Sequence, residues 1–544
     1  MNTRKSTQGA FKAALLSGCV AAMSLAIASP SLAQPAAPAT PAAPQPWFGL
    51  KLPPPTNDPA KPVLQFEDAH LPVQPAVFGP GPKSPLLAPP RMRADLIKIV
   101  DFSLRSKAQG DFRWGRIVGT PLHHETVGWL VDQLKEAGVP NAKLEEYPGV
   151  LSIPTAAEVR IFGSPAFGPG SADVVLDTAD TEGRGPVNGT VTGPLVYVGH
   201  ATEADLTGRD IKGKIAVMHT TPSPGMLASD DFRRERNLIT GGASGVINIM
   251  EAAGNLKSYT PLGGCGDKMC FSVGGQDGFF LENALGKAGQ AGQEMRAKIS
   301  ATAELKKITG ANGYAVIPGK KSRSAIVLNM HADAWYNGAD DNGSGLVVGL
   351  ALARYFAKTP LDHDLVFLID GGHHTQPGIP EFRKAHAGVL ENASLIINLE
   401  HVAAAGMTRG FAQPADNNFQ HRYVLSTTEY PKEVSVSNMS PFLIDVWRKA
   451  SSCFMIPLER VVDDNAPGEP STMRDLLKKI PVTQMTEYNP LYHTSGEDVT
   501  SVTDEGLERA ARFFAYMIMQ ADKASPELLQ GAPYAATKGC PKIP

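Results

Sequence analysis

The sequence has little net charge and few long apolar runs, and each shortage excludes a class of function. The 544 residues carry a formal net charge of −3, so the chain lacks the basic excess that nucleic-acid binding requires. After the N-terminus no run approaches the roughly 18 continuous apolar residues of a membrane-spanning helix, and we predict none in the mature chain. A hydrophobic fraction of 42% allows an ordinary globular core. The length suggests more than one domain, at roughly 150 residues each.

The N-terminus has the pattern of an export signal. Three basic residues precede a stretch of small and apolar residues over 13–28, and Ser31-Leu32-Ala33 matches a cleavage pattern. The segment Leu16-Ser17-Gly18-Cys19 also resembles a bacterial lipoprotein box. We rank a lipid anchor at Cys19 second, because the apolar region before it would be very short. The chain is therefore predicted to be exported, to the periplasm or outside the cell.

Cysteine is scarce as well. Cleavage after Ala33 would leave four cysteines, Cys265, Cys270, Cys453 and Cys540, and an even number in an exported protein favours disulfide bonds. Cys265 and Cys270 share one glycine-rich loop and could form a short bridge, while Cys453 and Cys540 could hold the C-terminal tail. All three possible pairings stay open. The segment C-G-D-K-M-C is also compatible with metal binding, although no further Cys or His lies close to it.

Composition and hydrophobic pattern divide the chain into segments of different character. Residues rich in Ala and Pro cannot bury a core and predict an extended leader. Alternating strand and helix patterns predict a three-layer α/β sandwich with a mostly parallel central sheet, interrupted by an inserted α+β domain. We expect a signal peptide at 1–33, the leader at 34–90, the main domain at 91–179 and 306–525, the insertion at 180–305, and a C-terminal tail at 526–544.

Apolar runs and helical spacing place the individual elements. For the main domain we predict strands at 156–162, 325–329, 365–369, 394–399 and 481–485. Its helices are expected at 92–106, 124–137, 345–358, 380–386, 441–451 and 505–522. In the insertion we predict strands at 191–198, 214–218 and 245–249, with helices at 235–242 and 279–288.

Residues that can bind metal follow four of the predicted strands. They are His331 and Asp341 in H-A-D-A-W-Y-N-G-A-D-D-N-G-S-G, His373 and His374 in G-G-H-H, Glu400 and His401 in N-L-E-H-V, and His493 in L-Y-H-T-S-G-E-D. The first loop alone is equally compatible with a solvated turn, because Asp, Asn and Gly are ordinary turn residues. Ligands of α/β sheets gather where strands end, and His, Asp and Glu bind Zn²⁺ in catalytic sites. Four such loops together favour a metal site.

These motifs resemble the M28 family of zinc exopeptidases, which share a three-layer α/β core. The resemblance covers residues 91–522, with H-x-D before G-A-D-D-N-G-S-G and Y-H-T-S-G-E-D-V as its strongest parts. Segments D-I-K-G-K-I-A-V-M and G-A-S-G-V-I-N-I of the insertion resemble a protease-associated domain. The resemblance implies the following roles: His331 and Glu400 hold one zinc ion, Asp341 bridges two, His493 holds the other, Asp333 orients His331, and Tyr492 donates a hydrogen bond to the developing oxyanion.

The chain departs from the family at one pair of residues. Two adjacent glutamates, a general base and then a metal ligand, are expected after the second strand, where this chain has His373 and His374. We predict that His374 replaces the ligand, because neutral imidazole binds Zn²⁺. His373 is predicted to act as the base, since its unperturbed pKa of about 6.5 suits neutral pH. Glu400 also stands where many family members have Asp.

The resemblance implies a metal-dependent hydrolase, which the N-terminal signal pattern predicts to be exported. We expect an aminopeptidase that removes N-terminal residues from peptides, with two zinc ions per chain, although one is possible. Two alternatives stay open because the glutamate pair is absent. The first is a catalytically impaired relative that binds metal or peptide. The second is an acyltransferase similar to glutaminyl cyclases, which would use a single zinc ion.

Overall fold

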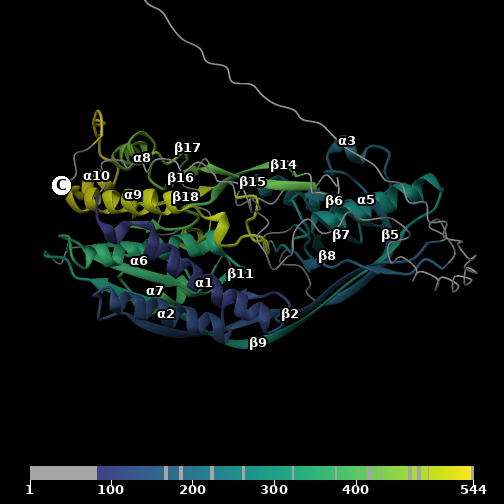
Figure 1. Ribbon diagram of the computed structural model, residues 1–544, viewed down its shortest axis with the longest axis horizontal. Helices are drawn as coiled ribbons and strands as arrows, with labels where there is room; N and C mark the ends of the chain where they lie inside the picture. The colour runs from purple at the N-terminus through teal and green to yellow at the C-terminus, as the bar shows by residue number, and fades with distance from the viewer. Residues whose placement is uncertain are drawn as a thin grey trace, which may run out of the picture. The chain divides into compact units, whose positions relative to one another are not determined.

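The computed structural model describes residues 82–540, apart from 165–169, 183–187, 221–225, 260–263, 322–323, 374–376, 413–419, 431, 463–467, 474–478 and 488 (Figure 1). The predicted signal peptide with Cys19, the leader up to residue 81 and His374 therefore lie outside the described residues. None of the helices in the described part of the chain combines the length and apolar composition that crossing a membrane requires.

The middle of the main sheet consists of parallel strands. In spatial order they are β12 (Asp364–Asp370), β10 (Ala325–His331), β13 (Ala393–Asn398) and β18 (Val482–Glu487). At one side β9 (Arg296–Ile317) pairs with β12 in the antiparallel direction. At the other, β16 (Lys432–Val436) is antiparallel to β18, and β17 (Leu458–Val462) is parallel to β16. The predicted α/β class with a mostly parallel sheet is confirmed.

Helices pack on both faces of this sheet. One face is covered by α1 (Pro89–Ala108), α2 (Pro121–Glu136), α6 (Gly345–Phe356), α8 (Pro441–Phe454) and α9 (Asp504–Lys523). The other carries α7 (Gly378–Ala385). Successive residues of β10 enter opposite cores: Ile326 and Leu328 pack with the first group and Val327 with the second. Burial on both faces explains why these strands read as continuous apolar runs.

Two long strands connect this sheet with a second group of elements. β2 (Lys143–Ile161) and β9 pair in the antiparallel direction along nearly their whole length. The far end of β9 pairs with β5 (Gly189–Tyr197). Beyond it follow β6 (Ile215–Thr220), β7 (Gly245–Met250) and β8 (Met269–Val273), with the helices α4 (Met226–Thr240) and α5 (Gly275–Gln290). This region has hydrophobic clusters of its own. Its identity as a protease-associated domain stays a prediction.

Short elements complete the described part of the chain. The short strands and hairpin strands are β1 (Gly115–Arg116), β3 (Val174–Val175), β4 (Asp180–Thr181), β11 (Ala334–Trp335), β14 (Ala405–Ala412) and β15 (Gln420–Glu429). The short helical segments are η1 (Pro85–Leu87), α3 (Glu203–Leu206), η3 (Ala339–Ser344), η4 (Glu469–Met473), η5 (Val499–Ser501) and α10 (Pro526–Leu529).

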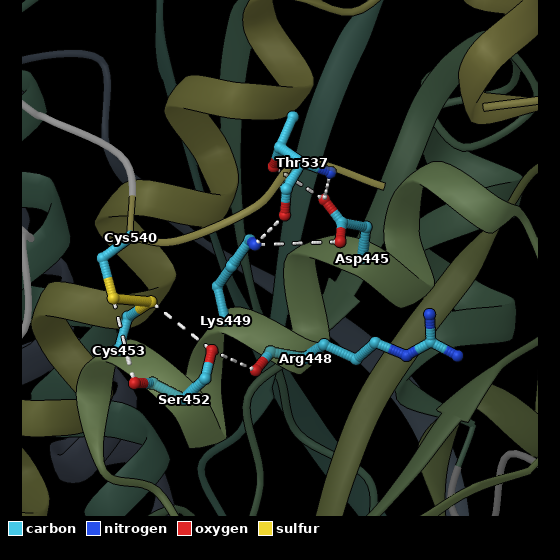
Figure 2. The surroundings of a disulfide bond; sticks show 7 residues. All are labelled: Asp445, Arg448, Lys449, Ser452, Cys453, Thr537 and Cys540. Carbon is cyan, nitrogen blue, oxygen red and sulfur yellow. Dashed lines mark hydrogen bonds and ion pairs between the residues drawn. A yellow bond between two sulfur atoms is a disulfide. The ribbon is translucent and has the colours of Figure 1, made fainter. Parts of the chain in front are cut away.

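Two disulfide bonds select one of the three pairings that the sequence left open. Cys265 bonds to Cys270, and Cys453 bonds to Cys540. Figure 2 shows the second bond, which joins α8 to the C-terminal tail. Asp445 of α8 holds the same tail by accepting hydrogen bonds from the backbone and hydroxyl of Thr537, at 3.3 and 3.1 Å.

Candidate metal centre

The loops after four parallel strands bring imidazoles and carboxylates into one buried cluster. His331 is the last residue of β10, and Asp341 lies in η3, which follows β10 and the short strand β11. Glu400 follows β13, and His493 lies beyond the end of β18. Each of these four residues is at most 4% exposed. The carboxyl ends of parallel strands meet at the same edge of a sheet, and this topology brings together these four of the five predicted ligands.

Asp341 occupies the centre of the cluster, with its two oxygens facing different imidazoles. Oδ1 lies 3.0 Å from Nε2 of His331. Oδ2 lies 2.9 Å from Nε2 of His493 and 3.4 Å from Nε2 of His373. The loop is fixed from behind, since the backbone N–H groups of Asp340 and Asp341 donate to Glu497. One carboxylate thus links two groups of ligand-type atoms.

The first group surrounds Oδ1 of Asp341. Oε1 of Glu400 lies 3.8 Å from Nε2 of His331 and 3.5 Å from Nε2 of His401. Nε2 of His401 is 3.6 Å from Oδ1 of Asp341. Adjacent residues of an extended chain point to opposite sides, but His401 has a φ of 49°, in the left-handed region. This turn places His401 in the same cluster as Glu400, and a strand pattern does not predict it.

The second group surrounds Oδ2 of Asp341 and includes His373. Nε2 of His373 lies 2.9 Å from Nε2 of His493, and the backbone N–H of His373 donates to Oδ1 of Asp333 at 3.0 Å. The imidazole of His373 therefore lies among ligand-type atoms.

Asp333 contacts both histidine loops. Its carbonyl oxygen lies 3.0 Å from Nδ1 of His331, whereas its carboxylate oxygen Oδ1 lies 3.4 Å from that atom. At Nδ1 of His331 the backbone carbonyl of Asp333 is thus closer than its carboxylate. The carboxylate also accepts from the backbone N–H of His373.

The distances between ligand-type atoms bracket those of zinc ligands in the first group and are slightly shorter in the second. Tetrahedral ligands that lie about 2.0–2.2 Å from a zinc ion are about 3.3–3.6 Å from one another. In the first group the contacts between ligand atoms span 3.0–3.8 Å. In the second they span 2.9–3.4 Å. Nitrogen and carboxylate donors at these separations match the chemistry of a catalytic zinc site.

Electrostatic effects within the cluster oppose one another. Burial raises the pKa of Asp341, but the charges of His373 and His401 outweigh burial and hold that pKa well below its usual value. Burial lowers the pKa of His493 to about 4, which favours the neutral imidazole that a metal needs. Burial and then the charge of Glu469 raise the pKa of Glu400. Imidazoles, rather than solvent, keep the central carboxylate ionised.

Glu469 belongs to the cluster although it does not follow one of the four strands whose loops contain the predicted ligands. It is fully buried at the start of η4, and its Oε1 lies 2.8 Å from Nδ1 of His373. One of its oxygens lies within 4.8 Å of ligand atoms of His331, His373 and Glu400. The segment P-G-E-P around Glu469 has neither strand nor helix periodicity, so the sequence offers no signal that links it to the site.

Aromatic side chains flank the second group of ligands. Trp335 lies 5.1 Å from the ring of His373 and 4.6 Å from that of His493, measured between centroids. The ring of Tyr492 stacks on His493 at 3.6 Å. Tyr259 packs edge-on against Trp335, with 4.8 Å between the centroids. These rings reduce the contact of the ligand histidines with solvent.

The inserted region touches the loop that carries His493. The backbone N–H of Tyr259 donates to the carbonyl oxygen of His493 at 3.1 Å, and that of Ser495 donates to Lys257 at 2.9 Å. Ser258 and Thr494 form an antiparallel bridge. The insertion therefore supports one wall of the cluster.

Comparisons with known proteins show similarity to peptidase family M28 and to aminopeptidases. Residues 312–518 match peptidase family M28. The aminopeptidase YwaD of Bacillus subtilis (strain 168) is 23% identical over 378 residues, which is 64% of this chain and 71% of that protein. The fold is similar to that of BSAP, a zinc aminopeptidase from Bacillus subtilis, with a TM-score of 0.53 at 17% identity over 80% of this chain and 97% of that one. A peptidase M28 precursor from Shewanella amazonensis SB2B gives a TM-score of 0.55 at 14% identity, over 80% and 96% of the two chains.

Proposed function

Because this chain is an M28 aminopeptidase-like hydrolase, we propose that it is an exported aminopeptidase that removes N-terminal residues from peptides at a pair of zinc ions. The observation that carries the proposal is the position of Asp341. One of its oxygens faces His331, and the other faces His373 and His493. A carboxylate between two sets of neutral donors is suited to bridge two cations.

The proposed ligands fall into two sets that share Asp341. The first zinc ion would be held by His331, Asp341 and Glu400, and the second by Asp341, His373 and His493. His401 is close enough to Glu400 and Asp341 to add a fourth ligand to the first set. The assignment of His373 follows its contacts in the cluster, and the base role that the sequence suggested for it is not part of this proposal.

Zinc, when bound, polarises a carbonyl group and lowers the pKa of water. The side chains around it would position the substrate and limit access of bulk solvent. Trp335 packs against both His373 and His493, so it orients two ligands and shields them from solvent. Tyr492 stacks on His493, and we assign its phenol the hydrogen bond to the developing oxyanion. Asp333 would keep His331 in position through the contacts to its ring.

The insertion would shape access to this site. Tyr259 of the insertion packs on Trp335 and binds the backbone of His493. We propose that this region is a protease-associated domain that covers one side of the peptide substrate. The two disulfide bonds support the proposed export, because disulfides persist in oxidising compartments.

Metal analysis of the purified mature protein together with hydrolysis of aminoacyl and peptide chromogenic substrates tests the function. The proposal predicts two zinc ions per chain and turnover that a chelator abolishes and zinc restores. Metal without turnover across a broad panel would support a binding protein instead. One zinc ion per chain and cyclisation of an N-terminal Gln without hydrolysis would support an acyltransferase.

A further inference from the structure

Glu469 approaches the cluster from a segment unrelated to the four loops that carry the proposed ligands. It lies between β17 and β18 in the chain, at the start of η4. Its side chain is fully buried, and Oε1 lies 2.8 Å from Nδ1 of His373. Gly468, directly before it, has a φ of 69°, and a Cβ there would lie only 2.8 Å from Oε2 of Glu400. The left-handed backbone at Gly468 favours glycine, and the absence of a side chain there lets the chain pass close to Glu400 and place Glu469 in the cluster.

The contact between Glu469 and His373 determines which ring nitrogen can bind a metal. An ionised carboxylate accepts hydrogen bonds and cannot donate them, so Nδ1 of His373 carries the proton in this pair. When the ring gives up its second proton to bind a cation, its free electron pair is on Nε2. That atom faces Oδ2 of Asp341 at 3.4 Å and Nε2 of His493 at 2.9 Å. Hydrogen bonding at one nitrogen therefore directs the other toward the metal position.

The backbone of His373 is held separately from its ring. Both carboxylate oxygens of Asp333 accept from the backbone N–H of His373, at 3.0 and 3.1 Å. Glu469 contacts the ring at Nδ1. Two acidic residues from different segments thus fix the main chain and the imidazole of one residue.

We propose that Glu469 is the positioning residue that makes His373 a metal ligand, an inference that rests on the proposed two-zinc function. Glu469 holds the proton on Nδ1 and keeps the plane of the ring directed at Asp341. Its carboxylate also lies beside His331 and Glu400. Without this carboxylate, the neutral imidazole of His373 would leave less negative charge around the two cations.

Zinc affinity of the full mature protein tests this role without relying on turnover. The metal-free protein is titrated with zinc against a chromophoric chelator, for the wild type and for Glu469→Ala and Glu469→Gln. We expect Glu469→Ala to lower the affinity for one of the two zinc ions by about 10- to 100-fold, as is typical when a group that orients a ligand is lost. Glu469→Gln should lose less, because its amide oxygen still accepts from Nδ1. The matched control is Glu508→Gln, a buried glutamate bound to Arg512 on α9, which should leave both affinities unchanged.

A double-mutant cycle separates positioning of His373 from a general effect on the fold. If Glu469 acts through His373, its substitution should change zinc affinity much less in a His373→Ala background than in the wild type. The cycle with Glu469→Gln decides the question if the alanine variant does not fold. An equal loss in both backgrounds, or a Glu469→Ala protein that binds both ions like the wild type, would overturn the inference. A wild-type protein that binds fewer than two zinc ions would instead overturn the proposed function.

Discussion

Two buried clusters of acidic groups in this chain behave in opposite ways. In the metal centre, the charges of His373 and His401 keep the pKa of Asp341 well below its usual value despite burial. In the insertion, burial and then the charge of Glu235 raise the pKa of Glu182 to about 8. Burial also raises the pKa of Glu235. The amide of Asn248 donates to both glutamates, but its neutral dipole does not compensate for the desolvation of a charge.

The comparison shows why acidic clusters alone do not indicate a metal site. Burial favours the neutral acid, which is a poor ligand, unless cationic or metal partners stabilise the charged form. Cys265 and Cys270 lie close to Glu235 in an arrangement that could hold a metal, but their sulfur atoms are bonded to each other. The alternative that C-G-D-K-M-C binds metal therefore does not hold for this oxidised form. Histidines distinguish the metal centre from the insertion cluster.

The largest expected effect comes from removing the carboxylate that links the two ligand sets. Asp341→Asn should release at least one zinc ion and lower turnover to below about 1% of wild type, a greater loss than the 10- to 100-fold typical of groups behind a ligand. Glu182→Gln, in the other cluster, should change neither zinc content nor turnover. Elemental analysis and peptide hydrolysis measure both. An Asp341→Asn protein with two zinc ions would remove the distinction between the clusters.

A smaller loss of activity or zinc affinity is expected for substitution of Asp333, which contacts the loops that carry the ligands but is not itself a proposed metal ligand. Asp333→Ala should reduce kcat/KM or zinc affinity by about 10- to 100-fold, because it frees the backbone of His373 and weakens the support of His331. Asp445→Asn is a suitable control, since Asp445 is also buried but binds the C-terminal tail. If both variants lost activity equally, the effect would be one of folding rather than of the site.

Much of the main domain was predictable because its strands are buried on both faces. β10, β12 and β13 appear in the sequence as apolar runs, whereas β18 has only two apolar residues, Val482 and Met485. The loops after all four contain the ligand-type residues. β2 and β9 were largely missed. The stretch 143–155 of β2 contains Pro148, Gly149 and Pro154, residue types that argue against a strand, and its residues other than Tyr147 are exposed or half-exposed. Glu469 was missed for another reason. It reaches the site from a loop, and only the three-dimensional path of the chain places it beside His373.

The stability of the insertion should fall as the pH rises, whereas the contribution of a salt-bridged acid is lost as the pH falls. The folded-state pKa of Glu182 is raised from 4.5 to about 8, so the folded form binds its proton more tightly than the unfolded form. This contribution is fully present below about pH 4.5 and is lost as the pH rises toward 8. Glu182→Gln should remove much of that dependence. Hydrogen exchange of β6 and β7 between pH 5 and 9 measures it, and a wild type whose exchange-derived stability rises across this window would contradict the assignment.

The smallest effect is expected for the disulfide beside Glu235. Cys265→Ser with Cys270→Ser should leave the number of zinc ions unchanged and lower the stability of the insertion by about 2 kcal/mol, as expected for such a short loop. Chemical denaturation followed with a probe in the insertion measures the stability. A fall in zinc content would show that the insertion cluster, and not only the histidine cluster, contributes to metal binding.

The central claim is that Asp341 links two zinc ions held by separate sets of side chains. Crystals of the zinc-loaded protein, with anomalous scattering recorded at the zinc absorption edge, test it most directly. We predict two peaks, one beside Oδ1 of Asp341 with His331 and Glu400, and one beside Oδ2 with His373 and His493. A single peak that does not touch Asp341, or peaks at Glu182 and Glu235 instead, would contradict the claim.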